Sequence, residues 1–302
     1  MYNMLNGAVG LAALLAASIA TAAPAMAQKV FPSAQAAADD LVAAAKAGRA
    51  GFVAELFGPR GRQLVSTGDA EQDKQNLAQF VEAVSTRFKL EDKDANTKLL
   101  VIGEREFPFP IPIMKQGDGW AFDPVAGQRE IRARVIGHNE LAAMSACAAY
   151  MGAQKDYIRN DRDGDSVFEY AQRIISSPGR KDGLYWEPES QSDISPLEGA
   201  LADAVRAALT GARTYEGYVF RILRAQGPAA PGGAYHYVIN GNMIGGFALV
   251  AWPAEYGNSG IMTFLVNQQG RVYQSDLGPR TAKTAAALQA YDLGANWSVS
   301  PD

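Results

Sequence analysis

Carboxylates at alternate positions are the residues of this sequence best suited to chemistry. Asp161, Asp163 and Asp165 stand at every second position of the stretch DRDGDSVFEYAQ, and Glu169 follows at the ninth place. Calcium-binding loops of the EF-hand type use carboxylates at this spacing, because closely placed negative charges repel one another unless a cation neutralises them. The stretch therefore predicts a calcium site built from these four side chains.

Two positions of the same stretch depart from the EF-hand pattern. Ser166 stands where the sharp turn prefers glycine, and Gln172 stands where a bidentate glutamate is expected. Aspartate and glycine also favour solvated turns that hold no metal. The sequence leaves both interpretations open, a calcium loop and a simple turn.

Residues for acid–base or nucleophilic catalysis are scarce. The chain has two histidines, His138 and His236, and one cysteine, Cys147, which lies among small apolar residues. Two distant histidines without a cysteine partner argue against a zinc enzyme, and the stretch around Ser259 lacks the spacing of a G-x-S-x-G elbow. We expect His138 to cap a helix and Cys147 to lie in the core, and the sequence favours a protein that is not an enzyme.

Aromatic residues in polar loops are the remaining candidates for contact with a partner or ligand. Tyr185 and Trp186 lie in GLYWEPE, and Trp252 and Tyr256 lie in WPAEYG. Such side chains stack on sugars or anchor partner proteins, or they fold back over the protein's own sheet. The net charge of -4 gives no basic excess, which argues against nucleic-acid binding.

An apolar segment near the N-terminus indicates export. Residues 8–23 form an alanine-rich apolar run, and Ala25 and Ala27 supply the small side chains of an A-x-A cleavage site. The run is shorter than the ~20 residues of a membrane-spanning helix. We predict a signal peptide over residues 1–27, a periplasmic or secreted mature chain, and no membrane span after cleavage. A retained anchor helix is the alternative, because residues 1–7 contain no lysine or arginine.

Residues 28–136 predict an N-terminal α+β domain in which helices precede a small sheet. Ser33 is placed to cap the first helix, and an apolar stripe from Leu77 to Phe88 marks the third. Prolines within residues 107–114 indicate an edge strand, and a GDGW turn closes a hairpin after it. This order resembles part of the cone-shaped fold of nuclear transport factor 2-like domains, over residues 33–124.

Residues 137–302 predict a second domain, so that the whole protein is of the α+β class. Residues 126–158 are expected to be helical, and the part from His138 onward is rich in small residues and is expected to be buried against a sheet. Its larger apolar side chains share one face: Leu141, Met144, Cys147 or Ala148, and Met151. A further helix is expected over residues 197–211. Glycine-rich turns then separate strand-length runs, which indicates an antiparallel meander packed on the first helix. The runs are GYVFRILR, AYHYVIN, GFALVAW, GIMTFLVN and RVYQSD.

Motifs along the mature chain resemble those of an uncharacterised exported bacterial family, domain of unknown function 2950. They are FPFPIPI, IGHNELAA, DRDGD with EYAQ, GRKDGLYW and the glycine-rich block that ends in VYQSDLG. The resemblance implies export, and it brings no activity, substrate or catalytic residues. The C-terminal half, through MTFLVNQQGRVYQSD, also resembles the globular heads of type II pseudopilins, which implies a pilin-head-like fold.

These features predict an exported protein with a non-catalytic binding or envelope-assembly role. Its expected partner is an envelope protein or a polysaccharide, and its expected cofactor, if the acidic loop holds one, is calcium. The alternative is a small-ligand-binding or hydrolytic role in a cone-shaped N-terminal pocket, lined by polar residues of the third helix and Trp120.

Overall fold

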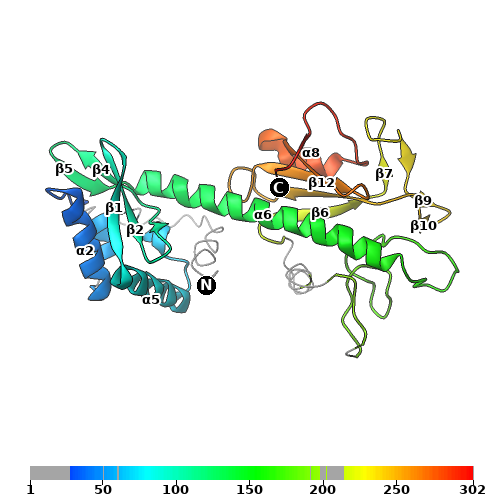
Figure 1. Ribbon diagram of the computed structural model, residues 1–302, viewed down its shortest axis with the longest axis horizontal. Helices are drawn as coiled ribbons and strands as arrows, with labels where there is room; N and C mark the ends of the chain where they lie inside the picture. Colours follow the sequence, from blue (N-terminus) through cyan, green and yellow to red (C-terminus); the bar gives the residue numbers. More distant parts are fainter. Residues whose placement is uncertain are drawn as a thin grey trace, which may run out of the picture. The chain divides into compact units, whose positions relative to one another are not determined.

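The chain folds as two compact units, with the division between Arg134 and Val135. Helices and antiparallel sheets occur in both (Figure 1), which confirms the expected α+β class. The predicted signal peptide (residues 1–27) and most of the helix predicted over residues 197–211 lie outside the described residues. The computed structural model describes residues 28–49, 51–59, 61–190, 192–197, 202 and 214–301.

Helices come first in unit 1, and Ser33 caps the first of them as predicted. The Ser33 hydroxyl accepts a main-chain hydrogen bond of 3.1 Å at the start of the first helix, and the Asp69 carboxylate accepts two at the start of the longest one. Ala37, Leu41 and Ala44 of the first helix are buried. The helices are α2 (Ala34–Lys46), α3 (Phe52–Phe57), α4 (Gly61–Val65) and α5 (Ala70–Thr86).

An antiparallel sheet completes unit 1. Its strand order is β1-β2-β4-β5, and β3 also pairs with β2. The hairpin of β4 and β5 turns at Gly117 and Asp118 as predicted, and α2 packs against both of its strands (Figure 1). The strands are β1 (Phe88–Asp94), β2 (Thr97–Ile102), β3 (Phe107–Pro108), β4 (Ile113–Gln116) and β5 (Gly119–Phe122).

The expectation of one edge strand over residues 107–114 is wrong. Only β3, at its beginning, pairs with one end of β2, whereas Ile113 and Met114 enter β4, which lies between β2 and β5. Proline has no main-chain N–H, so Pro110 and Pro112 interrupt the ladder between the two short strands.

The interior of unit 1 is built from apolar side chains. The ring of Phe57 meets that of Phe122 edge-on, with 5.0 Å between the ring centroids. The ring centroids of Phe80 and Phe109 lie 5.5 Å apart. Such ring pairs add to the free energy gained by burying apolar surface. The buried members of this core are Phe31, Ala34, Ala37, Ala38, Leu41, Val42, Leu56, Phe57, Val84, Leu100, Ile102, Ile111, Ile113 and Phe122.

A long helix, α6 (Pro124–Tyr157), contains the division between the units. His138, predicted to cap a helix, lies inside α6, so that prediction is wrong. The preceding Gly137 does not end the helix, because a helical glycine costs only about 1 kcal/mol relative to alanine.

The predicted face of α6 is observed only in part. Cys147 is fully buried and Met144 and Met151 pack against the core, but Leu141 is 63% exposed. Small residues lie on several sides of the second half of the helix, so apolar content alone does not select a face. The buried stripe also carries two tyrosines, an asparagine and a glutamine. The buried residues follow one another at spacings of three and four, with two adjacent pairs among them: Asn139, Ala143, Ala146, Cys147, Tyr150, Ala153, Gln154 and Tyr157.

A second antiparallel sheet forms the centre of unit 2, with the strand order β14-β13-β12-β11-β6. Four of the five predicted runs supply its longer strands, which confirms most of the meander. A 3-10 turn (Gly278–Arg280) and helix α8 (Thr281–Ala287) follow β13, and α8 packs against β11. The strands are β6 (Tyr218–Leu223), β11 (Ala248–Pro253), β12 (Met262–Asn267), β13 (Val272–Asp276) and β14 (Ser298–Val299).

The run AYHYVIN does not enter this sheet, contrary to expectation. It splits into β8 (Tyr235–His236), which pairs with β7 (Ala225–Gln226), and β9 (Val238–Ile239), which pairs with β10 (Asn242–Met243). The turn at Asn240 and Gly241, both at positive φ, folds the end of the run back on the residues that follow it. The main-chain groups of the run are thereby used in two small ribbons.

The core of unit 2 lies between α6 and the second sheet. Tyr150 of α6 donates to the Ala248 carbonyl of β11 (3.3 Å), and its ring meets that of Phe247 edge-on. Cys147 is fully buried, as predicted, and burial raises the pKa of its thiol to about 12. The thiol therefore stays protonated at neutral pH and acts as a small apolar side chain.

Candidate functional site

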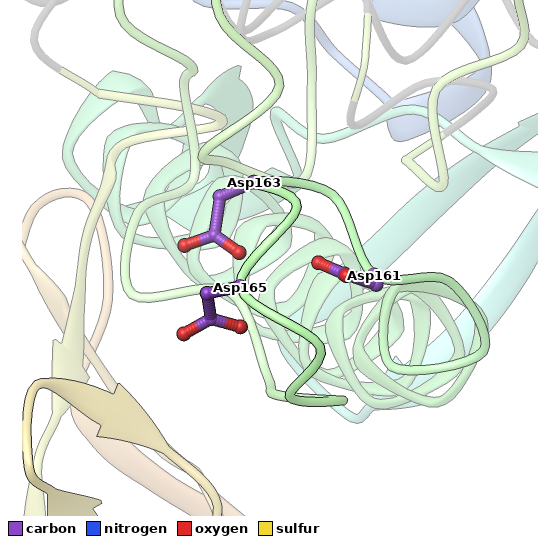
Figure 2. Close-up of side chains that lie close together, drawn as sticks. All are labelled: Asp161, Asp163 and Asp165. Carbon is purple, nitrogen blue, oxygen red and sulfur yellow. The ribbon is translucent and has the colours of Figure 1, made fainter.

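The loop after α6 brings the three alternating aspartates together. Asp161, Asp163 and Asp165 each offer one carboxylate oxygen, and these oxygens all lie within 4.8 Å of one another. Figure 2 shows the Asp161 side chain pointing toward those of Asp163 and Asp165. Glu169 does not join this group. The carboxylates of the group are thus close enough to be bound by one cation.

Asp161 also organises the backbone of this loop. Its two carboxylate oxygens accept hydrogen bonds from the amides of Gly164 (2.8 Å) and Ser166 (2.9 Å). These hydrogen bonds stabilise the ionised form and hold the pKa of Asp161 below its usual range. Ser166 has a φ of 71°, so it adopts the left-handed conformation that the EF-hand pattern gives to glycine at this place.

Three side chains of the loop bind the β9–β10 hairpin. One Asp165 oxygen accepts a hydrogen bond from the Asn242 side chain (2.7 Å), and one Glu169 oxygen accepts from the Met243 amide (2.8 Å). Gln172, at the twelfth place, donates to a carbonyl of the hairpin turn (2.6 Å). The residues at the ninth and twelfth places therefore attach the loop to the hairpin instead of completing a ligand set.

No basic side chain of the described residues balances the charges of the three aspartates. Within the described residues, no lysine or arginine forms a salt bridge with Asp161, Asp163 or Asp165. The adjacent Arg162 instead places its guanidinium 5.0 Å from the ring centroid of Trp186. Carboxylate oxygens are hard ligands, and three of them leave the rest of a calcium coordination sphere to water or main-chain oxygens.

Trp186, one of the predicted contact residues, lies in the core of unit 2 and is only 7% exposed. The Arg162 guanidinium and the Lys181 ammonium both lie over its ring, at 5.0 and 5.4 Å from the centroid. The indole N–H donates to Asp193 (2.9 Å), which also pairs with Lys181 (2.6 Å). This set of partners accounts for Trp186 as a structural residue of the loop that folds back over the core.

The other aromatic candidates are also largely covered. Tyr185 is buried and donates to Glu187 (2.6 Å), and Trp252 is a buried residue of β11. Tyr256 is half-buried and donates to Asp276 (3.2 Å); burial, with a smaller effect of the Asp276 carboxylate, raises its pKa. Their contact with a partner stays a prediction, and their burial supports the alternative that these aromatics cover the protein's own sheet.

Comparison with known proteins identifies the family of the chain. Residues 28–299 match the model of a family described as a protein of unknown function (DUF2950). The chain belongs to this family. No curated protein and no solved structure matches the chain, so the resemblances to nuclear transport factor 2-like domains and pseudopilin heads stay predictions. Among the residues that the structure describes, no helix has the length and apolar content needed to cross a membrane.

In this DUF2950 protein, the described side chains that could act in catalysis contact other residues and not one another. His138 lies 3.6 Å from the Glu216 carboxylate, and His236 is exposed on β8. The Ser259 hydroxyl accepts a hydrogen bond from the Glu255 amide (3.0 Å) and donates to the Glu255 carbonyl (3.2 Å). In the described part of the chain, no hydrogen bond or ion pair joins a histidine to Ser259.

Sequence reasoning missed the residues that hold the acidic loop on its two sides, Asn242 and Arg162. The Asn-Gly pair at residues 240–241 is typical of a tight hairpin, so a hairpin there could have been found. Nothing local indicates that Asn242 binds a side chain 77 positions earlier. Arg162 gives no signal either, because its contact with Trp186 depends on how two loops fold together.

A second set of missed residues explains part of the IGHNELAA motif. Asn139 donates from its side chain to the Ser259 carbonyl (2.8 Å), and Glu140 accepts from the amides of Ile261 (2.8 Å) and Met262 (2.9 Å). These bonds fix the loop before β12 to α6. Gly217 completes the contact, because a Cβ there would come within 2.6 Å of the Ser259 Cβ.

Proposed function

We propose that this DUF2950 protein is an exported, non-catalytic binding or assembly protein of the cell envelope, and that calcium at the acidic loop stiffens its binding surface. Export is supported by the predicted signal peptide of residues 1–27. The family match begins at Gln28, directly after the predicted cleavage site. Cleavage there would release a mature chain into the periplasm or the medium.

The observation that carries the proposal is an exposed apolar side chain inside the acidic loop. Phe168 is 58% exposed, and it lies between Asp165 and Glu169, which both bind the β9–β10 hairpin. Ile239 and Ile244, at the two ends of that hairpin, are exposed as well. An apolar partner surface would cover these three side chains and remove their apolar area from water.

Calcium would act on the loop that carries Phe168. Neutralising the three close carboxylates removes their mutual repulsion and restricts the loop, so that less conformational entropy is lost when a partner binds. Asp161 already holds the backbone turn through two hydrogen bonds, so the ligand oxygens are partly positioned before a cation arrives.

An envelope protein fits this surface better than a polysaccharide. Stacking on sugar rings needs exposed aromatic faces, and Tyr185, Trp186 and Trp252 are buried. Exposed phenylalanine and isoleucine side chains are instead suited to the apolar centre of a protein interface. The separate engagement of the histidines, Ser259 and Cys147 supports a role without catalysis.

The proposal is tested by using the purified mature protein as bait in envelope extracts, with calcium or with a chelator. We expect the wild-type bait to capture a partner in calcium, and Phe168→Asp to lower the recovered partner by about tenfold, because a charge replaces an apolar anchor. Ile194→Asp is the matched control, since Ile194 is 62% exposed in a different loop and should leave capture unchanged.

Two results would contradict the proposal. One is equal capture by the wild type and Phe168→Asp in the presence of calcium. The other is turnover of ester, peptide or glycoside substrates by the mature protein, which would show that it is an enzyme.

A further inference from the structure

The segment after the predicted cleavage site is part of the folded unit from its first residue. The Lys29 amide donates to the Glu55 carbonyl (3.1 Å), and the Lys29 ammonium pairs with the carboxylates of Asp40 (2.9 Å) and Glu55 (3.2 Å). Phe31 exchanges two main-chain hydrogen bonds of 2.8 Å with Trp120 of β5, and its ring is buried in the core. Residues 28–31 thus extend the packing of unit 1.

Gln28 anchors this segment through its side-chain amide. The nitrogen Nε2 donates to the main-chain oxygens of Leu56, in α3 (2.9 Å), and of Phe122, at the end of β5 (2.5 Å). A carboxamide nitrogen has two hydrogens, and both are used here. The two acceptors lie 28 and 94 positions away in the sequence, so the amide joins separate elements of unit 1.

A chain that begins with glutamine is subject to a specific chemical loss. Its free α-amine attacks the side-chain carbonyl carbon Cδ, so that an N–Cδ bond forms and the Cδ–Nε2 bond breaks. One proton passes from the amine to the departing nitrogen, which leaves as ammonia, and a five-membered lactam remains. The lactam has no Nε2, so in this protein the Leu56 and Phe122 carbonyls would both lose their donor.

We propose that Gln28 is the first residue of the mature protein and that the fold of unit 1 protects its side-chain amide from this cyclisation. The inference rests on the proposed export, because only cleavage after Ala27 gives Gln28 a free α-amine. Protection follows from the two hydrogen bonds of Nε2 and from the fixed Lys29 main chain, which together restrict the approach of the amine to Cδ.

The test compares cyclisation in the folded and unfolded states of the same chain. Mature protein that begins at Gln28 is released from an N-terminal fusion by a protease and incubated folded or in guanidinium chloride. Intact mass then follows the loss of one ammonia. The two hydrogen bonds of Nε2 should lower the cyclisation rate of the folded chain to about one tenth of the rate of the unfolded chain, or lower. Equal rates in the two states would overturn the protection.

A variant separates the effect of this anchor from that of folding in general. Lys29→Ala removes the ion pairs to Asp40 and Glu55 and keeps Gln28, so its folded form should cyclise faster than the folded wild type. Lys46→Ala, at the last residue of α2, is the control and should match the wild type. If folded Lys29→Ala cyclises no faster than the control, the ion pairs of Lys29 do not contribute to the protection of Gln28.

Whether Gln28 is the first residue of the mature protein is decided by the N-terminus of the protein recovered from its own cell envelope. An unmodified Gln28, read by mass spectrometry of the first peptide, supports both cleavage and protection. A different first residue would overturn the proposed cleavage site, and the folded-against-unfolded comparison would still decide the protection. A cyclised Gln28 in the folded, exported protein would confirm the cleavage and overturn the protection.

Discussion

Two acidic loops of unit 2 differ in how the negative charge of their carboxylates is balanced. In the loop that folds back over the core, Asp193 accepts hydrogen bonds from the Lys181 ammonium, the Trp186 indole and the Glu189 amide. These partners, Lys181 first, lower the pKa of Asp193 to about 2. In the loop after α6, three carboxylates crowd together without a basic partner among the described residues.

This difference distinguishes Asp193, a structural carboxylate, from the three aspartates of the loop after α6, which are candidate cation ligands. The charge of Asp193 is balanced within the protein, so this side chain has little left to offer a ligand. The charges around Asp163 are unbalanced and exposed, so an external cation is the group that would balance them. Arg162 links the two loops, because its guanidinium lies over Trp186 and not beside the aspartates.

Removing the buried indole should have the largest effect. Trp186→Ala deletes a core side chain and the donor to Asp193, and we expect it to lower the free energy of unfolding by about 3–5 kcal/mol. Denaturant unfolding followed by circular dichroism measures the change. Ile194→Ala, at an exposed site nearby in the sequence, should change stability by about 0.5 kcal/mol or less. Similar losses in both variants would show that the Trp186 loop is not a folded structural element.

Calcium should have the next largest effect, confined to the loop after α6. A ligand that binds the folded state at one hundred times its dissociation constant stabilises that state by about 2.7 kcal/mol. We expect added calcium to raise the melting temperature of the wild type and to leave that of Asp163→Ala unchanged. Asp118→Ala, in the exposed β4–β5 turn, is the matched control and should keep the response. No calcium shift in the wild type would support the simple-turn interpretation.

The smallest effect is expected from acid acting on Asp193. Its folded pKa of about 2 lies below the ordinary value of 3.8, so its ionised form stabilises the fold above about pH 4. That contribution is lost as the pH falls toward 2. The stability difference between the wild type and Asp193→Asn should therefore shrink over this range, as measured by denaturant unfolding at several pH values. A difference that stays constant down to pH 2 would show that the Asp193 charge is not what stabilises the loop.

Part of the candidate site could be predicted from the sequence. The alternation of Asp161, Asp163 and Asp165 brings them together because a short turn with Gly164 leaves them no room to separate. The roles of Glu169 and Gln172 could not be predicted in this way. Their partners belong to the β9–β10 hairpin, which is distant in the chain and reaches the loop only after unit 2 has folded.

The burial of the loop aromatics was equally beyond local reasoning. Trp186 lies in a polar stretch, which predicts an exposed side chain. In the structure, however, Arg162, Lys181 and Asp193 contact its indole. A flexible loop shows no periodic pattern, so the sequence indicates which residues it contains and not which of them face inward.

The sequence by itself determined the elements whose signals are local. Caps at Ser33 and Asp69, the glycine turn of the β4–β5 hairpin and the β-branched runs of the second sheet depend on neighbouring residues, which act before any long-range contact forms. The tertiary structure decided which face of α6 is buried and that residues 235–239 leave the sheet. A helix with small residues on several sides offers several nearly equivalent faces, and a short run can pair with several strands. Only packing against distant residues selects among these possibilities.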